Sequence, residues 1–429
     1  MQRSLFSSAF AFTLLVVSGC AGGGGGGGGG GVIPPVADTS AMPRTAGLVS
    51  ACAGDATIRI AWRAVDADGA PLAIALFAGA DRNSVYVGVP AATATGDGSR
   101  EFSGQSNGVE RFFGLALDDG AGGYTPSGTV LVARPAAPIY VDAASVAVTP
   151  NGSTPALAYR DPIDAALQAF AQGGGNVWIA AGSYTDVAVP LWPGVHVYGG
   201  FDASFALAAR DPQAHETRLN GRAGAALVEI LGGEPGAVLD GCTLDGAGVA
   251  PFGVDIDQAS AELRSLVIED CQGRGMRVRS IALDRAFDVR IAGCRISSNG
   301  AEGVSVDGAF DLWVEATRCA NNGFEGFDCG GLVAPDGVPV RLRVHDSVFS
   351  GNGQEGLDCD MVPPLQLGAA GGHYEVEIAN SRFEANGNAL VPNSMSGLNL
   401  DIDFELVAGW SADIVVRGHR LAKHADVIA

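Results

Sequence analysis

A short pattern centred on Asn-Gly recurs four times in the C-terminal part of this 429-residue chain. Its asparagines are Asn299, Asn322, Asn352 and Asn386, so successive copies are separated by 23, 30 and 34 residues. Each copy has two short strand-like segments about the turn and is too small to bury its own apolar side. Stacking of the copies would bury it. The repeat therefore predicts a coil of parallel strands with one constant turn and loops of variable length elsewhere.

Alternation along the strand that follows each turn separates inward from outward residues. The apolar positions are expected in the core: Val254/Ile256, Met276/Val278, Val304/Val306, Phe327/Cys329, Leu357/Cys359 and Leu398/Leu400. Cys319 is expected in another core column, with Ile296, Phe349 and Phe383. We expect the four asparagines to form an internal ladder that hydrogen-bonds the turns.

A longer run of sequence supports the same fold. IYVD, AALQAFAQGGGNVWIAAGSYTD, GVHVYGGFDASFALAARDP and TRLNG follow one another from Ile139. This run resembles the opening of the right-handed parallel β-helix (pectin-lyase-like) proteins, and the resemblance implies such a fold over residues 139–429, with a helix capping its N-terminal end. The helix is predicted over residues 161–172. Asp161 is its N-cap and Pro162 its first residue, and apolar residues recur at helical spacing: Ile163, Ala166, Leu167 and Phe170.

Residues 51–136 alternate in the manner of short strands, with Gly/Asp-rich turns between them, and predict a small β-sandwich. Trp62 on an early segment, with RFFGLAL and TVLVARP near the end, resembles a fibronectin type III domain. Trp62 is expected in its core. The chain is thus predicted to be all-β, with a right-handed parallel β-helix preceded by a small sandwich that serves as a spacer.

The N-terminus reads as an export signal. Residues 1–20 have an Arg-bearing start and an apolar run that ends in small residues, too short for a membrane span. Their end, Val17-Ser18-Gly19-Cys20, resembles the bacterial lipobox, which implies cleavage before Cys20 and lipidation of its thiol; ordinary signal cleavage is the alternative. Because Ala21 follows, we expect the outer membrane or cell surface of a Gram-negative bacterium. Residues 21–50, with ten consecutive glycines, are expected to be a tether.

Charge and cysteine content narrow the function classes. The net charge of −21 argues against nucleic-acid binding. Seven cysteines remain besides Cys20, and none forms a CxxC pair that would indicate zinc. Burial as small hydrophobes is expected for them, with a Cys329–Cys359 disulfide as the alternative.

The outward positions of the repeated strand carry the candidate site. They are Asp255/Asp257, Arg277/Arg279, Ser305/Asp307, Asp328/Gly330, Asp358/Asp360 and Asn399/Asp401. Asp328 is expected beside Asp358, because adjacent coils lie about 4.8 Å apart. Two such carboxylates repel each other, so either one takes up a proton or a cation bridges them. Ca²⁺ is the natural candidate, with Asp307, Asp360 and Asp401 as further ligands; a solvated acidic stripe is the alternative.

Two functions remain open. β-Helix enzymes such as pectate lyases, polygalacturonases and alginate epimerases act on acidic polysaccharides, and Gly326-Phe327-Asp328 resembles the start of the epimerase pattern Gly-Phe-Asp-Pro-His-Asp. Cys329 and Gly330 replace its Pro and His, and the six histidines of the chain share no motif and are expected on the surface or in loops. The first hypothesis is therefore a surface lipoprotein whose β-helix is a non-catalytic glycan-binding, adhesion or structural module, with no catalytic residue assigned. The second is a lyase or epimerase acting through the Asp328/Asp358 region.

Overall fold

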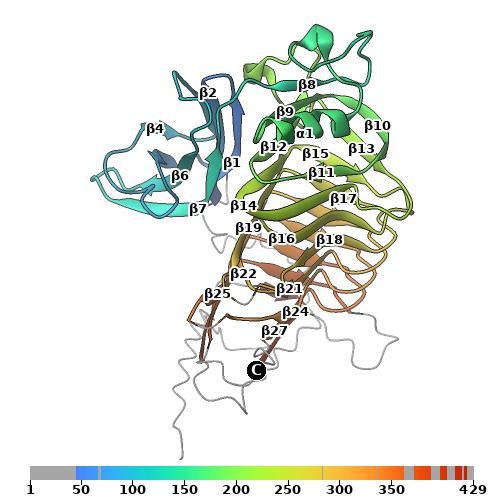
Figure 1. The fold of residues 1–429 in the computed structure, drawn as a ribbon. Coiled ribbons are helices and arrows are strands. Elements are labelled where there is room, and N and C mark those ends of the chain that lie inside the picture. Colours follow the sequence, from blue (N-terminus) through green and yellow to red (C-terminus); the bar gives the residue numbers. More distant parts are fainter. Residues whose placement is uncertain are drawn as a thin grey trace, which may run out of the picture.

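The computed structural model describes residues 45–65, 69–282, 284–335, 337–361, 372–387, 397–402, 411–417 and 420–422. The predicted signal peptide, Cys20 and the predicted tether up to residue 44 lie outside the described residues. Within them the chain forms a small antiparallel β-sandwich and then a right-handed parallel β-helix (Figure 1). The predicted fold class is confirmed.

The sandwich consists of two antiparallel sheets. The first contains β1 (Thr45–Gly54), β2 (Thr57–Val65) and β5 (Gly98–Ser103); the second contains β4 (Ala92–Thr95), β3 (Ala73–Gly79), β6 (Arg111–Asp118) and β7 (Tyr124–Ala133). Trp62 lies in the core between them, and its indole N–H donates to the Gly96 carbonyl oxygen at 3.0 Å. Residues 45–50 were expected in the tether, but they belong to β1, because Ala46 and Leu48 are buried in the same core.

Each coil of the β-helix contributes one strand to each of three faces, and the long strands β14 (Val228–Asp240) and β16 (Phe252–Arg264) span two of them. Face one contains β11 (Val189–Leu191), the first parts of β14 and β16, β18 (Arg274–Arg279), β21 (Val304–Gly308), β24 (Phe327–Leu332), β27 (Leu357–Met361) and β30 (Leu398–Ile402). Face two contains β8 (Ile139–Val141), β9 (Gly175–Ala180), β12 (Val195–Phe201), the later parts of β14 and β16, β19 (Phe287–Ala292), β22 (Phe310–Glu315), β25 (Pro339–His345), β28 (His373–Ala379) and β31 (Ser411–Arg417).

Face three is a separate nine-stranded sheet. It contains β10 (Gly182–Val187), β13 (Thr217–Gly221), β15 (Cys242–Asp245), β17 (Val267–Glu269), β20 (Arg295–Ser297), β23 (Arg318–Ala320), β26 (Val348–Ser350), β29 (Arg382–Glu384) and β32 (Arg420–Ala422). Between β16 and β29 each turn from face two to face three has two residues, and the first of them has a positive φ. Gly293, Ala316 and Asn380 are examples. The corner between face one and face two varies: only Ala309 separates β21 from β22, whereas residues 333–338 separate β24 from β25.

The predicted asparagine ladder is confirmed between faces three and one. Asn322 Nδ2 donates to Asn352 Oδ1 at 3.0 Å, and Asn352 Nδ2 donates to Asn386 Oδ1 at 2.8 Å. Each of these Oδ1 atoms also accepts from the backbone N–H of the preceding asparagine. The ladder explains the recurring glycine of the Glu-Gly pairs: a Cβ at Gly326 would lie 2.7 Å from Asn352 Nδ2.

The columns predicted for the core are confirmed. Cys329 lies in register with Cys359, and both are fully buried with free thiols. Cys319 lies between Ile296 and Phe349 in successive coils. Each of the seven cysteines within the described residues is a buried free thiol, so packing accounts for them without a disulfide.

Helix α1 (Pro162–Ala171) lies against β8, β9 and β11 at the N-terminal end of the coil. Asp161 accepts a hydrogen bond from the Ile163 N–H at 2.9 Å, as its N-cap position requires. The prediction that Ile163, Ala166, Leu167 and Phe170 form the packed face of the helix is partly wrong. Leu167 and Phe170 are exposed, because the helix approaches the sheet through small residues (Ala165, Ala166 and Ala169) instead.

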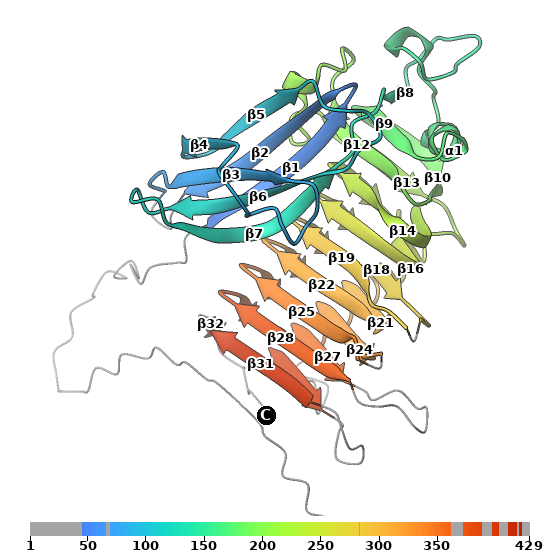
Figure 2. The same cartoon turned by 60° about the vertical axis from the view of Figure 1, so that its left-hand side comes forward.

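The sandwich is docked on the β-helix and does not stand apart as a spacer. It lies across the first coils of face two and leaves β25, β28 and β31 uncovered (Figure 2). At the centre of the contact Arg264 is fully buried, donates to the carbonyl oxygens of Ala51 at 2.9 Å and Val132 at 2.7 Å, and forms an ion pair with Glu262 at 2.7 Å. The edge of β1 is thereby covered, which protects its unpaired carbonyls from other strands.

Candidate functional site

Face one presents a continuous outward column with one polar side chain from each coil. The pairing of strands places in register Glu229, Asp255, Arg277, Ser305, Asp328, Asp358 and Asn399. Because neighbouring strands lie about 4.8 Å apart, the column repeats at a constant spacing along the axis of the coil. Asp328 and Asp358 are neighbours in it, as the sequence predicts.

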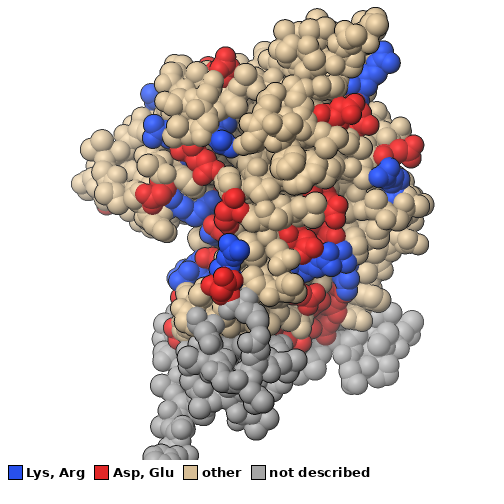
Figure 3. Space-filling view, viewed as in Figure 1, with Lys and Arg blue, Asp and Glu red and all other residues tan. Residues whose placement is uncertain are grey.

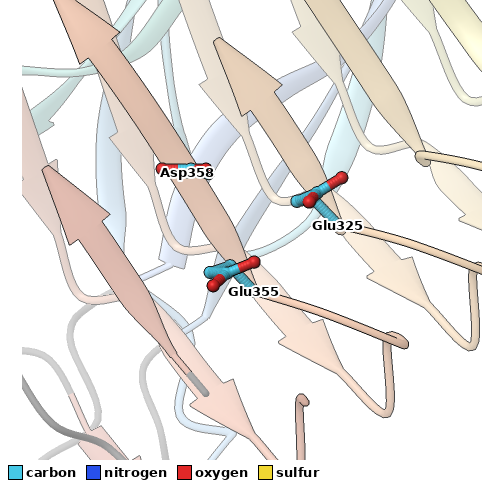
Figure 4. Close-up of side chains that lie close together, drawn as sticks. All are labelled: Glu325, Glu355 and Asp358. Atoms are coloured by element: carbon cyan, nitrogen blue, oxygen red, sulfur yellow. The ribbon is translucent and has the colours of Figure 1, made fainter. Parts of the chain in front are cut away.

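Two further glutamates join these aspartates. Glu325 and Glu355 lie just before β24 and β27, and one carboxylate oxygen from each lies within 4.8 Å of the other and of an oxygen of Asp358 (Figure 4). Glu302 holds the corresponding position before β21 and forms an ion pair with Arg274 at 2.8 Å. We call these residues the acidic row: Glu302, Glu325, Asp328, Glu355 and Asp358.

The acidic row is electrostatically strained. Burial raises the pKa of Asp328 from 3.8 to about 7, and the charges of Glu302, Asp358 and Asp307 add to the rise. Burial likewise raises the pKa of Glu325 from 4.5 to about 7. Near neutral pH both groups are therefore partly protonated, which relieves the repulsion among neighbouring carboxylates. A divalent cation would relieve it in another way.

Of the predicted ligands that the structure describes, only Asp358 belongs to the group of carboxylates within 4.8 Å of one another, although the charge of Asp307 acts on Asp328. Asp307 lies opposite Gly331, and Asp360 lies in register with Asp401 of β30. The predicted register of Asp307 with Gly330 is wrong, because β24 contains a β-bulge between Cys329 and Leu332 that adds one residue. Asp307, Gly330 and Asp360 are therefore not in register in successive coils, contrary to the prediction from the sequence.

The glutamates of the acidic row were not among the predicted site residues, although the sequence carried a signal for them. Three of the four copies contain Glu-Gly at the same place, in AEGV, FEGF and QEGL. The turn position hides their direction, because period-two alternation applies only from the first residue of the strand onward. A search for acidic residues repeated in register, without regard to strand alternation, would have found them.

The other end of face one is basic and ion-paired. Arg277 binds the Asp255 carboxylate through two hydrogen bonds of 2.9 and 2.6 Å, and its guanidinium lies 4.0 Å from the centre of the Phe252 ring. A pocket of about 340 Å³ opens beside these residues, with Arg222 and Glu229 also in its lining. In Figure 3 acidic side chains gather over β21, β24 and β27, beside a basic patch over β18.

Histidines do not complete this site within the described residues. His345 and His373 lie on face two, where each is within ion-pair distance of a glutamate. His196 was expected at the surface, and this expectation is wrong: it is fully buried under the sandwich, where burial lowers its pKa to about 3. Neither of its ring nitrogens has a hydrogen-bond partner among the described residues.

The sequence matches no family model and no curated protein. Among solved structures it is similar to a periplasmic alginate epimerase (12% identity, 58% of this chain, 70% of that chain, TM-score 0.33). It is also similar to the A-module of a mannuronan C-5 epimerase of Azotobacter vinelandii (12% identity, 67% of this chain, 100% of that chain, TM-score 0.28). A third similar structure is a family 28 exopolygalacturonase of Yersinia enterocolitica (12% identity, 89% of this chain, 92% of that chain, TM-score 0.21). Likeness of this degree carries no argument about activity, and the fold assignment rests on the strand pairing. Within the described residues no helix is long and apolar enough to cross a membrane.

Proposed function

We propose that this protein is a cell-surface lipoprotein whose β-helix binds polysaccharide along face one, without catalysis. The observation that carries the proposal is the column of seven outward polar residues, in register from Glu229 to Asn399. Asp255 and Ser305 are buried, and the other five residues of the column are at least partly exposed. These five offer hydrogen-bonding groups along the axis of the coil, which suits a linear polymer that presents the same groups again and again. The sandwich, with antiparallel sheets of three and four strands, supports the fibronectin type III-like assignment of the N-terminal domain.

Calcium is part of this proposal. Ca²⁺ takes six to eight oxygen ligands and tolerates irregular geometry. Glu325, Glu355 and Asp358 offer carboxylate oxygens within 4.8 Å of one another. A cation held there would remove the repulsion within the acidic row and give an acidic glycan a positive centre to bind. Because the carboxylates are half-buried rather than enclosed, we expect an affinity of the extracellular class, roughly 0.1 to 1 mM.

The test compares thermal unfolding and glycan binding in millimolar Ca²⁺ and in chelator. We expect Ca²⁺ to raise the unfolding temperature, since it binds only the folded protein, and to enable binding of uronate polymers immobilised on a panel. The double variant Asp328→Asn/Asp358→Asn should lose both effects and remain folded. Asp164→Asn, on the exposed surface of α1, is the matched control. Equal unfolding temperatures of the wild type in Ca²⁺ and chelator would refute the calcium site.

A second candidate function, a polysaccharide lyase or epimerase, is favoured by the pKa of Asp328. A carboxyl group with a pKa of about 7 exchanges protons readily at neutral pH, as a general acid or base must. Incubation with alginate and polygalacturonate, followed by ultraviolet absorbance for unsaturated ends and by NMR for epimerised residues, tests this function. Turnover by the wild type that disappears in Asp328→Asn would establish catalysis; no product with any polymer would leave the binding function.

A further inference from the structure

A second cleft lies away from face one, between the sandwich and the β-helix. It has a volume of about 840 Å³ and is bounded on one side by β1 and β2 and on the other by the corner between faces two and three. Its size is within the range of ligand sites, and interfaces between domains are a preferred location for them. The acidic row has no residue in its lining.

The floor of the cleft is formed by one residue from each of five successive turns between faces two and three. They are Gly241, Ser265, Gly293, Ala316 and Asp346, all with positive φ. Four of the five have small side chains, so the floor is low and continuous. Five coils at about 4.8 Å per step give a floor about 19 Å long, parallel to the axis of the β-helix. The cleft is therefore shaped for an extended ligand.

Two arginines on the sandwich side of the cleft form no ion pair with the residues that the structure describes. Arg59 and Arg63 lie four residues apart on β2 and line the cleft. Neither forms an ion pair or a side-chain hydrogen bond with any residue that the structure describes. The other lining arginines are neutralised: Arg210 pairs with Asp240 at 2.7 Å, and Arg295 pairs with Glu269 at 2.8 Å. Both guanidinium groups are therefore available to an anionic ligand in the cleft.

Among the residues that the structure describes, the acidic groups of the lining do not pair with Arg59 or Arg63. Glu216 pairs with Arg218 at 3.2 Å, and Asp211 accepts hydrogen bonds from the backbone of its own turn. Burial raises the pKa of Glu315 to about 7 and also raises the pKa of Asp346. Glu315 Oε2 is further occupied by the Thr129 N–H at 2.6 Å.

A peptide strand is a poor occupant, because the edge of β1 is already used. The carbonyl oxygens of Val49, Ala51 and Ala53 accept from Ser265 Oγ at 3.4 Å, Arg264 Nη1 at 2.9 Å and Trp178 Nε1 at 3.0 Å. Addition of a strand would need these acceptors. Hydroxyl and amide side chains also line the cleft and suit a ligand rich in hydroxyl groups: Ser50, Gln213, Thr243 and Ser265.

We propose that this cleft binds a linear, carboxylate-bearing glycan, with its carboxylates at Arg59 and Arg63 and without calcium. A guanidinium binds a carboxylate through two parallel hydrogen bonds, which gives both affinity and orientation. The site goes beyond the proposed function, because it lies on another side of the coil and uses no residue of the acidic row.

The test is a calorimetric titration of the full chain with a galacturonate hexamer in chelator, so that a calcium-dependent site on face one is silent. We expect binding that weakens with salt and falls at least tenfold in Arg59→Gln/Arg63→Gln. The matched control Arg100→Gln, exposed on β5 outside the cleft, should bind as the wild type does. A neutral glucose hexamer should not bind.

The outcomes separate this proposal from the proposed function. Binding in chelator that persists in Asp328→Asn/Asp358→Asn and is lost in Arg59→Gln/Arg63→Gln assigns the cleft, whether or not face one binds glycan in Ca²⁺. Absence of hexamer binding in chelator would overturn the inference. So would equal binding by the double arginine variant, once circular dichroism shows it to be folded, or equal binding of the neutral hexamer.

Discussion

Asp328 has a raised pKa because it is partly buried among other carboxylates on face one. Burial is the largest cause of the raised pKa, and Glu302 and Asp358 add like charge from the neighbouring coils. The sequence alone predicts the pair Asp328/Asp358, since register follows from the repeat. The glutamates that surround the pair are set by turn geometry, which strand alternation does not describe.

The raised pKa values make stability depend on pH. The folded-state pKa of Asp328 is about 7, above its ordinary value of 3.8, so its favourable contribution is fully present below about pH 4 and is lost as pH rises through 7. Glu325 and the buried Glu315 act in the same direction. We expect the unfolding temperature in chelator to fall between pH 5 and pH 8, measured by circular dichroism. Asp328→Asn should reduce this slope and unfold at a higher temperature than the wild type at pH 8; an unchanged slope would contradict the assignment.

The asparagine ladder explains why the register of the β-helix can be predicted from the sequence. Asn299, Asn322, Asn352 and Asn386 repeat because each amide must hydrogen-bond the next turn, so a local pattern reports a long-range register. The β-bulge in β24 leaves no such trace. It adds one residue beside Gly330 without disturbing the inward Cys329, and alternation read straight through it therefore misplaces Asp307 relative to Asp360.

The ladder should also be a main source of stability. Asn352→Ala would remove the side-chain partner of the Asn322 backbone N–H, of the Asn322 amide N–H and of the Cys319 carbonyl. Asn386 Oδ1 would keep only the Asn352 backbone N–H. Each unsatisfied buried group costs about 1–3 kcal/mol, so we expect a loss of about 3 kcal/mol or more in the free energy of unfolding, measured in urea. Asn83→Ala, at an exposed position of the sandwich, should change it by less than about 0.5 kcal/mol. A comparable small change in both would contradict the structural role of the ladder.

At the scale of the whole molecule, docking of the sandwich was not predictable from sequence. Arg264 and Glu262 occupy outward positions of β16, where charged residues read as solvent-exposed. Their burial depends on β1 and β7, which lie more than a hundred residues away in sequence and follow no period shared with the coil.

Arg264→Met tests whether this contact holds the two domains together. Its removal leaves Glu262 and Asp240 buried with one fewer cation, a change that costs about 3–5 kcal/mol for a buried pair. We expect the wild type to unfold in one calorimetric transition and Arg264→Met in two, and we expect the variant to have the larger radius of gyration in X-ray scattering. Arg318→Met, exposed on β23, should leave both unchanged. A single transition and an unchanged radius in Arg264→Met would show that the contact is dispensable.

Attachment to the membrane is a separate prediction, because Cys20 lies outside the described residues. If the lipobox resemblance is correct, radiolabelled palmitate supplied to expressing cells should enter the wild type and not Cys20→Ala. The labelled protein should fractionate with the outer membrane. Equal labelling of the two proteins would end the proposal of a lipid anchor.

The unequal corners of the coil bear on how such a chain diversifies. From β16 to β29 the corner between faces two and three always has two residues between the strands, one of them with positive φ. The corner between faces one and two ranges from a single residue between β21 and β22 to eleven residues between β27 and β28. Insertions at that second corner leave the pairing of every strand intact, and they lie at the C-terminal ends of the face-one strands, whereas the acidic row lies at the N-terminal ends. Homologous proteins are therefore expected to differ in length there while their ladder asparagines align. New ligand preferences can arise at the rim of face one without any cost to the scaffold that supports it.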